Sequence, residues 1–340
     1  MRPGYFVIKI AFCVKQFSDF SVIPAVWISI SVSKKVCIMK KAKKSPARTP
    51  FRDTAERQEM RRTRWFLVPS VAGVTVFFLA PFLVVIYYSM VDNPVAGNFV
   101  GFNNFIALLK NMAFQRAAAN TASFSLIAVP LAVILPLLFA ILLMQKIPMK
   151  SVFRTVLISP LMVPIASVVL IWEVLFHNNG AVNEWIMALG GTSIDWFKSD
   201  FSQMTIVLLY LWKNVGYNMI LFMAALAGIP KDITEAAQLD GAGALKTFFR
   251  IKLPYLSSSI LFVTILSVIN SFKVFREVYL LTGDYPYDSL YLLQHFMNNM
   301  FKSLDYQRLS AAAILMGIVM IVIIGILFLI DRKLGKDIEE

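Results

Sequence analysis

Long apolar runs, uncharged except for Lys213 in the fourth, alternate with charged segments along this chain. Six runs come close to the ~20 residues that a helix needs to cross a bilayer. The runs are continuous and do not alternate between apolar and polar positions, which favours helices over the strands of a barrel. The pattern predicts an all-α membrane protein with six transmembrane helices. They lie at 65–91, 117–145, 155–172 (apolar on to Phe176), 201–230, 253–272 and 309–330.

Composition supports the same class. Of 340 residues, 58% are hydrophobic and only 16% are charged, and the mean hydropathy is +0.68. A soluble domain has a lower apolar fraction and a higher charged fraction. A disordered chain has a still lower apolar fraction. The two cysteines, Cys13 and Cys37, are too few for a disulfide framework or a cysteine-based zinc site.

The basic residues are unevenly distributed, and their distribution predicts an orientation. The net charge is +13, with 33 Lys and Arg against 20 Asp and Glu. Twenty-five of the basic residues fall in the two termini and the loops after runs two and four, whereas five fall in the other loops. By the positive-inside rule, both termini are cytoplasmic. The positive charge is not accompanied by a nucleic-acid-binding motif, so we do not expect a nucleic-acid-binding protein.

The N-terminal segment does not fit this pattern. Within residues 1–38, the longest uncharged run is too short to span and contains Pro24. Met39 opens a lysine-rich stretch typical of a cytoplasmic start. We expect residues 1–38 to come from an upstream start site, outside the fold. Residues 39–64 are expected to form a basic cytoplasmic tail, 65–335 the six-span domain, and 336–340 a second tail.

The loop after the fourth run, residues 229–254, differs from the other loop expected in the cytoplasm, which is short and basic. Pro230 ends the run, and Asp232 is placed to cap a short helix from Ile233 to about Asp240, with Glu235 completing a capping box. Gly241 is placed to end that helix in a left-handed conformation, before further turns over 244–250. Ala236 and Ala237 offer a small-residue surface to another protein. The alternative is an amphipathic loop lying on the membrane.

The order of residues in this loop favours the first interpretation. Glu-Ala-Ala-x-x-Asp-Gly-Ala over 235–242, followed by Phe249, Ile251 and Leu253-Pro254, resembles the EAA loop of binding-protein-dependent ABC importer permeases. Other segments within 65–335 resemble the carbohydrate branch, the maltose and glycerol-phosphate type. They include Asn120-Thr121, Phe153-Arg154-Thr155, Pro160, Pro164, Trp172, Gly180, Asn183, Trp212, Gly216 and Leu281-Thr282-Gly283.

Two segments depart from the family pattern. Many relatives continue Leu-Thr with Gly-Gly-Pro, whereas this chain has Gly283-Asp-Tyr-Pro286. The usual Gly-Tyr-Ala-Ala before the last span is replaced by Asp305-Tyr-Gln-Arg-Leu-Ser-Ala-Ala312. Both departures lie in or beside one external loop, so they weaken the transfer of a substrate from relatives.

The resemblance implies a mechanism and a set of partners. The EAA helix would act as a coupling helix docked on a separate cytoplasmic ATPase, which is present in two copies. A second permease subunit and an extracytoplasmic binding protein carrying a carbohydrate would complete an importer in the bacterial cytoplasmic membrane. The resemblance assigns ATPase coupling to Asp232, Glu235, Ala236, Ala237, Asp240, Gly241, Ile251, Leu253 and Pro254.

The chain itself is expected to be a transport subunit and not an enzyme. It has no G-x-x-x-x-G-K-[ST] phosphate loop. We therefore expect it to bind no cofactor, and ATP and Mg to be used by the partner ATPase. The histidines, His177 and His295, are far apart and show no metal-ligand pattern.

Polar side chains inside two spans suggest where a solute could pass. Tyr210, Asn214 and Asn218 share one stripe of the fourth span. Ser267, Asn270 and Ser271 cluster on the fifth, at a similar depth. Hydroxyls and amides suit a neutral polyhydroxylated ligand, so these six residues are candidates for the translocation path. The alternative is hydrogen bonding between helices, which such residues commonly provide in membranes.

Several charged residues fall toward the external ends of their spans. They are Glu173, Lys213, Lys273, Arg276 and Glu277. They could form a vestibule that receives substrate, but ion pairs between neighbouring helices or snorkelling are the more common roles for such residues.

Two other classes of protein compete with the importer permease. An ion-coupled secondary transporter of a small polar solute usually needs an intramembrane carboxylate, and only the peripheral Glu173 and Glu277 come near. A polytopic enzyme would need a catalytic constellation that two distant histidines do not supply.

Overall fold

A computed structural model describes residues 67–93, 97–145 and 147–339 of the chain. Helices make up nearly all of this part, and its only β-type pairing is a bridge between Val91 and Phe99. The prediction of an all-α chain is confirmed for these residues. The predictions for 1–38 and 39–64 fall on residues that lie outside the described ones.

Five helices are long and apolar enough to cross a membrane, and a bent pair would make a sixth. The five match the first, second, fourth, fifth and sixth predicted spans. They are Leu67–Ser89, which contains a π-helical turn (η2, Thr75–Leu79) and α4 (Ala80–Ser89); α6 (Met112–Met144); α10 (Ser202–Ala227); α14 (Ser257–Lys273) with its continuation α15 (Phe275–Thr282); and α17 (Tyr306–Glu339).

The third predicted span, 155–172, is not one straight helix. It consists of α7 (Lys150–Met162) and α8 (Ile165–Leu175), which are bent by 105° relative to each other. Pro164 lies in the break, where its missing N–H and fixed φ end the ladder of α7. The expectation of a continuous third helix is therefore wrong, because a proline between two apolar segments changes direction without changing hydropathy.

Short helices occupy the connections. They are α5 (Asn103–Lys110), α9 (Ala181–Ala188), α11 (Lys231–Leu239), α12 (Ala244–Thr247), the π-helical η3 (Phe248–Lys252), α13 (Leu253–Tyr255), the 3₁₀ turn η4 (Asp288–Leu290) and α16 (Leu293–Lys302).

The chain forms two units, residues 1–104 and 105–340. In the first, the side chain of Asn104 donates to the carbonyls of Ser89 and Val91, both at 2.9 Å. These bonds tie the start of α5 to the end of α4. Asp92 accepts from the backbone and side chain of Asn98, which closes the turn between Val91 and Phe99.

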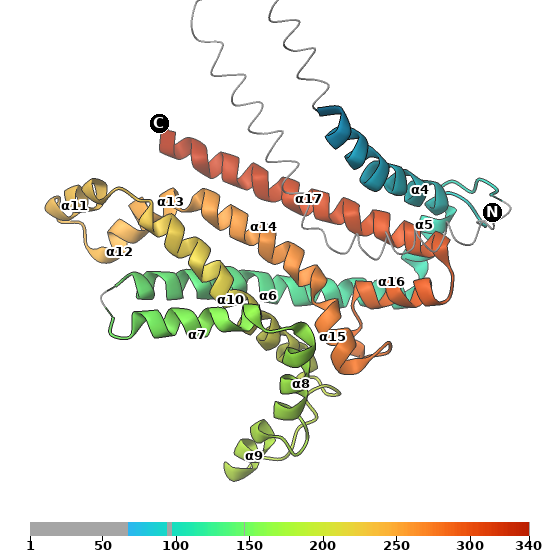
Figure 1. Ribbon diagram of the computed structural model, residues 1–340, viewed down its shortest axis with the longest axis horizontal. Coiled ribbons are helices and arrows are strands. Elements are labelled where there is room, and N and C mark those ends of the chain that lie inside the picture. The colour runs from blue at the N-terminus through green and yellow to red at the C-terminus, as the bar shows by residue number, and fades with distance from the viewer. Residues whose placement is uncertain (1–66, 94–96, 146, 340) are drawn as a thin grey trace, which may run out of the picture. The chain divides into compact units, whose positions relative to one another are not determined.

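In the second unit, α10 packs against α6, α7 and α14, and the four helices lie side by side (Figure 1). Small side chains on α6 allow this, since Ala128, Ala132 and Ala140 are fully buried. The largest core cluster fills the space between α6 and α10 with Phe124, Ile206 and Tyr210. Helix α10 is the most buried of the membrane-length helices, and its neighbours surround it.

Gly216 marks the closest approach of α10 to α7. A Cβ built on Gly216 would lie 1.9 Å from the carbonyl oxygen of Leu157 and 2.9 Å from the Cα of Ile158. Real Cβ atoms do not come so near backbone, so only glycine fits here. Small residues serve this purpose where transmembrane helices pack backbone to backbone.

We expect Gly216→Ala to force α7 away from α10 and to lower stability by about 1–3 kcal/mol, the usual cost of overpacking. The measurement is the melting temperature of the purified chain in detergent. Gly325→Ala is the matched control, because a Cβ at Gly325 of α17 meets nothing within 4 Å. An unchanged melting temperature for both variants would show that the α7–α10 contact is not constrained.

Candidate functional site

Helix α11 lies in the predicted coupling loop, but it begins earlier than expected. Its first residue is Lys231, with Pro230 at the N-cap and no side-chain capping bond. The prediction that Asp232 caps a helix from Ile233, with Glu235 as the second half of a capping box, is wrong. The fixed φ of Pro230 suits a helix entry, and Asp232 instead lies in the first turn, where its charge complements the helix dipole.

The end of α11 forms as predicted. Gly241 has φ +75°, in the left-handed region. Its N–H donates to the carbonyl of Gln238 at 3.0 Å, and the N–H of Ala242 donates to that of Ala237 at 2.9 Å. These two bonds define a Schellman turn, which satisfies carbonyls that the helix end leaves free. The loop therefore turns at a fixed point.

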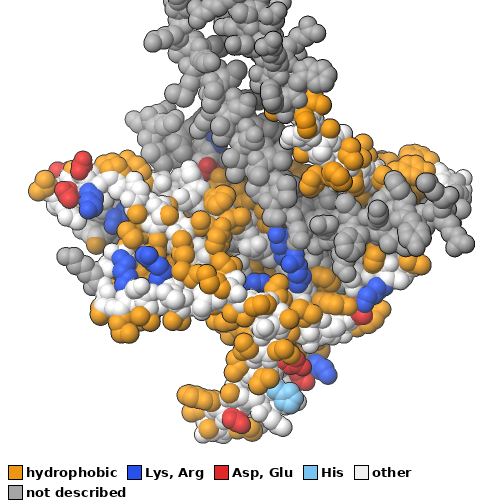
Figure 2. Space-filling model, in the orientation of Figure 1, with side chains coloured by type: hydrophobic (Ala, Val, Ile, Leu, Met, Phe, Trp, Pro, Cys, Tyr) orange, Lys and Arg blue, Asp and Glu red, His pale blue; other side chains and the backbone are white. Residues whose placement is uncertain are grey.

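Three large apolar side chains of this loop are exposed among its charged residues. Leu239 is 90% exposed, and Leu245 and Phe249 are also exposed. Glu235 and Ala236 are exposed and Ala237 is half-buried, and none of the residues of α11 is buried. Acidic and basic side chains lie over α11 and α12 (Figure 2). The alanine pattern pointed to this surface, whereas the exposed leucines carried no signal in the sequence.

The loop leads almost without interruption into a membrane helix. Helix α12, η3 and α13 follow one another directly, and only Leu256 separates α13 from α14. Ile251, Leu253 and Pro254 are half-buried along this stretch. The expected turns over 244–250 are present. A displacement of α12 would therefore pass to α14 through helical backbone.

A polar seam joins α10 to its neighbours α6 and α14. We use this name for the six candidate path residues and their contacts. The Tyr210 hydroxyl donates to the carbonyl of Ser267 at 2.7 Å, and the Asn218 amide donates to the Ser267 hydroxyl at 3.1 Å. The Asn270 amide donates to the Asn214 side-chain oxygen at 3.1 Å. The Ser271 and Ser125 hydroxyls lie 2.9 Å apart, which links α14 to α6.

Asn218 makes a second contact in the seam that has a specific cause. Its amide donates to the carbonyl of Ala132 on α6 at 2.8 Å. Pro136 lies four residues after Ala132 and has no N–H, so it cannot supply the helical bond that this carbonyl would otherwise receive. A buried side chain from another helix fills the place, as required where water is scarce.

The structure thus brings all six candidate residues together. Tyr210, Asn218, Ser267 and Ser271 are buried, and hydrogen bonds between helices engage them. Asn214 and Asn270 are half-buried. The contacts show that the six residues join helices; whether they also line a path for solute stays a prediction.

An ion pair joins α10 to α15. The ammonium of Lys213 contacts the carboxylate of Glu277, whose side chain is 6% exposed, while that of Lys213 is 23% exposed. The interpretation of these residues as an ion pair between neighbouring helices is confirmed for Lys213 and Glu277. Lys273 and Arg276 also interact with other groups, and Glu173 is exposed.

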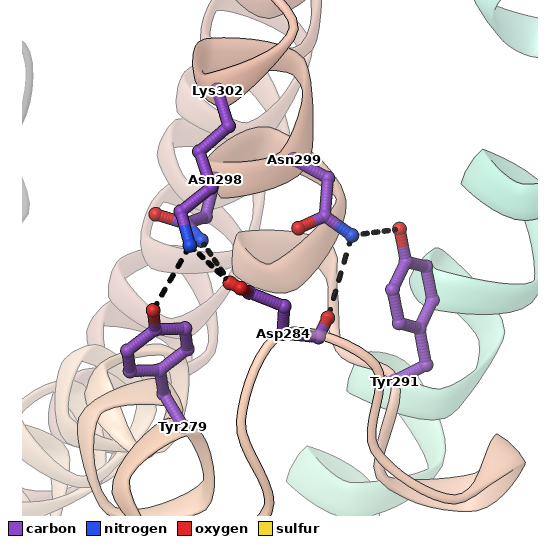
Figure 3. Close-up of polar contacts among 6 residues, drawn as sticks. All are labelled: Tyr279, Asp284, Tyr291, Asn298, Asn299 and Lys302. Atoms are coloured by element: carbon purple, nitrogen blue, oxygen red, sulfur yellow. Dashed lines mark hydrogen bonds and ion pairs between the residues drawn. The ribbon is translucent and has the colours of Figure 1, made fainter.

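A second polar cluster lies where the loop after α15 meets α16 (Figure 3). The carboxylate of Asp284 accepts from the ammonium of Lys302 at 2.5 Å and from the amide of Asn298 at 3.3 Å. The bond from Lys302 holds the pKa of the Asp284 carboxyl below its usual value. Lys302 also donates to the Tyr279 hydroxyl, and Asn299 to the Tyr291 hydroxyl. This network fixes the loop that departs from the family pattern.

The two histidines differ in environment. His295 is fully buried on α16, accepts from the backbone N–H of Leu292 at 3.2 Å, and packs edge-on against Phe275. Burial lowers its pKa to about 4, so it is neutral at physiological pH. His177 is exposed. Among the described residues, no group of three or more His, Cys, Asp or Glu side chains is placed to hold a metal ion.

Residues 105–340 match the family described as binding-protein-dependent transport system inner membrane component. The chain belongs to this family. It is therefore a transport permease, a multi-pass protein of the cytoplasmic membrane. The match covers the second structural unit, which holds the predicted coupling loop and the polar seam.

Named relatives of this permease act in the transport of sugars and of glycerol phosphate. It is 32% identical to the lactose transport system permease protein LacF of Rhizobium radiobacter, over 63% of this chain and 74% of that protein. It is 30% identical to the arabinooligosaccharides transport system permease protein AraP of Bacillus subtilis, over 81% and 88%. The identity is 28% to the sn-glycerol-3-phosphate permease UgpA of Yersinia enterocolitica, over 80% and 94%.

A solved structure shares the fold. A chain of a bacterial ABC transporter that imports the acidic polysaccharide alginate aligns with a TM-score of 0.72, over 83% of this chain and 99% of that one. The sequences are 20% identical, so the likeness establishes the architecture alone.

The bond from Asn218 to Ala132 can be tested by asking whether the Asn218 amide stabilises the protein by satisfying the Ala132 carbonyl. We expect Asn218→Ala to lower stability by about 0.6–1.7 kcal/mol, the range for hydrogen bonds between membrane helices. In a Pro136→Ala background, the restored N–H satisfies Ala132 within α6, so the same substitution should cost less. Melting temperatures of the four proteins in detergent form the double-mutant cycle. Strictly additive losses would contradict this account.

For the ion pair, we expect Glu277→Ala to cost about 3 kcal/mol or more, because it strands the partly buried ammonium of Lys213. Replacing both residues, Lys213→Met with Glu277→Leu, should recover most of the loss. The melting temperature again reports the effect. The exposed pair Arg116 and Asp288 is the matched control, and Arg116→Ala there should cost about 1 kcal/mol at most. Equal losses at both pairs would show that burial plays no part.

Proposed function

We propose that the chain is the membrane subunit of an ATP-driven importer that carries a carbohydrate, most simply an oligosaccharide, into the cell. Membership of the transport family and the names of relatives that transport lactose, arabinooligosaccharides and glycerol phosphate support this substrate class. Family membership also favours the importer over an ion-coupled secondary transporter. The neutral amides and hydroxyls of the polar seam suit a polyhydroxylated solute, if the seam borders the path.

The observation that carries the proposal is the surface of α11 and α12. A loop outside the membrane spans holds Leu239, Leu245 and Phe249 exposed on a rigid turn. Exposed apolar side chains on a loop that turns at a fixed point can bury their surface against another protein, which supports a docking role. We assign this surface to a separate ATPase, with coupling through the loop residues already named from Asp232 to Pro254.

The proposal includes a topology. We count α7 with α8 as one span, which gives six, and we place both termini and α11 in the cytoplasm because the basic residues gather there. This chain has no phosphate-loop sequence. In the proposal it is therefore not an enzyme and binds no cofactor, and two copies of the partner ATPase use ATP and Mg. A second permease and an extracytoplasmic binding protein would complete the assembly. A structure of the alginate transporter with its periplasmic protein supports the last partner.

The test uses the left-handed turn at Gly241. A Cβ there meets nothing within 4 Å, so a substitution acts through the backbone conformation and not through a clash. Valine at φ +75° costs about 1–2 kcal/mol or more, whereas asparagine tolerates this region. We expect tagged wild-type chain from its native membrane to recover an ATPase and a second permease, and Gly241→Val to lose the ATPase while keeping the second permease.

Two variants serve as controls in the same loop. Gly241→Asn keeps the turn, and Gly243→Ser changes a glycine with an ordinary φ of −67°. Both should recover the ATPase at the wild-type level. Recovery of the wild-type chain alone, or only with copies of itself, would overturn the proposed assembly. Full ATPase recovery with Gly241→Val would remove the coupling role from α11.

A further inference from the structure

Helix α9 (Ala181–Ala188) presents an apolar face that the described part of the chain leaves uncovered. Trp185 is 77% exposed and Leu189, which caps the helix, is 85% exposed. With Ala181, Val182 and Ile186 they line a shallow hollow of about 370 Å³. At 100° per residue, these five side chains occupy one continuous arc of the helix. Leaving a tryptophan side chain exposed to water forgoes the favourable free energy of burying its apolar surface.

The face is held rigidly and does not belong to a loose loop. Asn183 is fully buried, and its amide donates to the carbonyls of His177 and Ile194 at 3.1 and 2.9 Å. Its side-chain oxygen accepts from the N–H of Ile194 and the indole N–H of Trp196, both at 3.1 Å. One buried side chain thus fixes α9 against the segments on both sides of it. The orientation of the apolar arc follows from this anchor.

The end of α9 is fixed as well. Gly190, with φ +85°, donates to the carbonyl of Met187 at 3.0 Å, and Gly191 donates to that of Ile186 at 2.9 Å. This is a second Schellman turn. It stops the helix directly after Leu189 and leaves that side chain at the rim of the hollow.

The position of α9 along the chain places it at a membrane boundary. Helix α10 begins soon after α9 and ends at α11, and its 26 residues span about 39 Å at 1.5 Å per residue. Helices α9 and α11 therefore lie at opposite ends of a membrane-crossing helix. Between α7 and α9, α8 turns away by 105°. In Figure 1, α8 and α9 project away from the four packed helices α6, α7, α10 and α14.

The apolar arc of α9 continues a membrane-type surface. Leu170, Ile171 and Val174 form an exposed stripe on α8, which packs against α9. In Figure 2, hydrophobic side chains cover much of the α8–α9 projection, acidic, basic and histidine side chains lie toward its right, and one acidic patch lies at its lower end. A two-faced helix that continues from a membrane helix and carries a tryptophan is the form that lies in a bilayer interface. The arc has no Lys or Arg, so its affinity would come from apolar burial and not from anionic headgroups.

We propose that α9 is an interfacial anchor: its Trp185–Leu189 face lies in the headgroup and acyl boundary of the leaflet opposite α11, and it holds the bent end of the third span there. The partner is a phospholipid surface without a requirement for anionic lipid. This anchoring needs only that the chain spans a membrane, so it stands apart from the identity of the substrate and from the ATPase assignment.

The test places a spin label at single cysteines in the full chain, after Cys13→Ser and Cys37→Ser. Trp185→Cys and Leu189→Cys report the apolar face, and Glu184→Cys is the matched control on the exposed polar side of the same helix. In nanodiscs of zwitterionic phospholipid, collisions with oxygen and with a water-soluble nickel chelate are measured. We expect a several-fold higher oxygen-to-nickel ratio at 185 and 189 than at 184, unchanged by added anionic lipid.

Two results would overturn the proposal. Ratios at 185 and 189 equal to that at 184 would place the face in water. Low collision rates with both reagents would show that protein covers it, either a partner or another segment of this chain. A second measurement avoids the label: bromines near the headgroup end of lipid chains should quench wild-type tryptophan fluorescence more than that of Trp185→Phe. Equal quenching of the two proteins would also count against the anchor.

Discussion

The carbonyl of Ala132 lacks its donor within α6, and the amide of Asn218 supplies one from α10. In water the loss of one helical bond would cost little, because solvent would replace it. Inside a membrane the replacement has to come from protein, so the position of Pro136 fixes which residue of α10 faces α6. The same amide also bonds the hydroxyl of Ser267, which sets the register of α14 against both. The core of the second unit is organised around this shared contact.

A nearly continuous series of helices connects the exposed loop at α11 to the helix α14 that shares this contact. Helix α11 turns at Gly241 into α12, and from there helical backbone leads through η3 and α13 to α14. The π-helical turn at Phe248–Lys252 has a wider hydrogen-bond ring than the α-helix around it, and such turns occur frequently at functional sites. Contiguity alone does not make a transmission path, which requires two arrangements of the moving element. What the fold supplies is a nearly continuous helical connection from the exposed surface of α11 and α12 to the polar seam.

Much of this could be predicted, because charge and periodicity are local signals. The long apolar runs located α6 and α10, although Lys213 interrupts the second of them, and the glycine after Asp240 located the end of α11. The start of α11 was missed because Asp232 is the better capping residue by type, while Pro230 fixes the entry by its ring. The hydrogen-bond partners within the polar seam could not be predicted either. Tyr210, Asn218 and Ser267 show their polarity in the sequence, but which carbonyl each bonds depends on how three helices pack.

The bend in the third span was the largest error, and its reason is general. Hydropathy counts apolar residues and is blind to direction, so Met162 and Ile165 look continuous across a turn of 105°. Once α8 leaves the axis of α7, the third span no longer runs straight, and the outward-facing leucine and valine side chains of α8 still need an apolar environment. An interfacial helix directly after it satisfies that need. The four bonds of Asn183 then have a clear purpose, since an anchor works only if the helix that enters the lipid is rigidly joined to the helix that it holds.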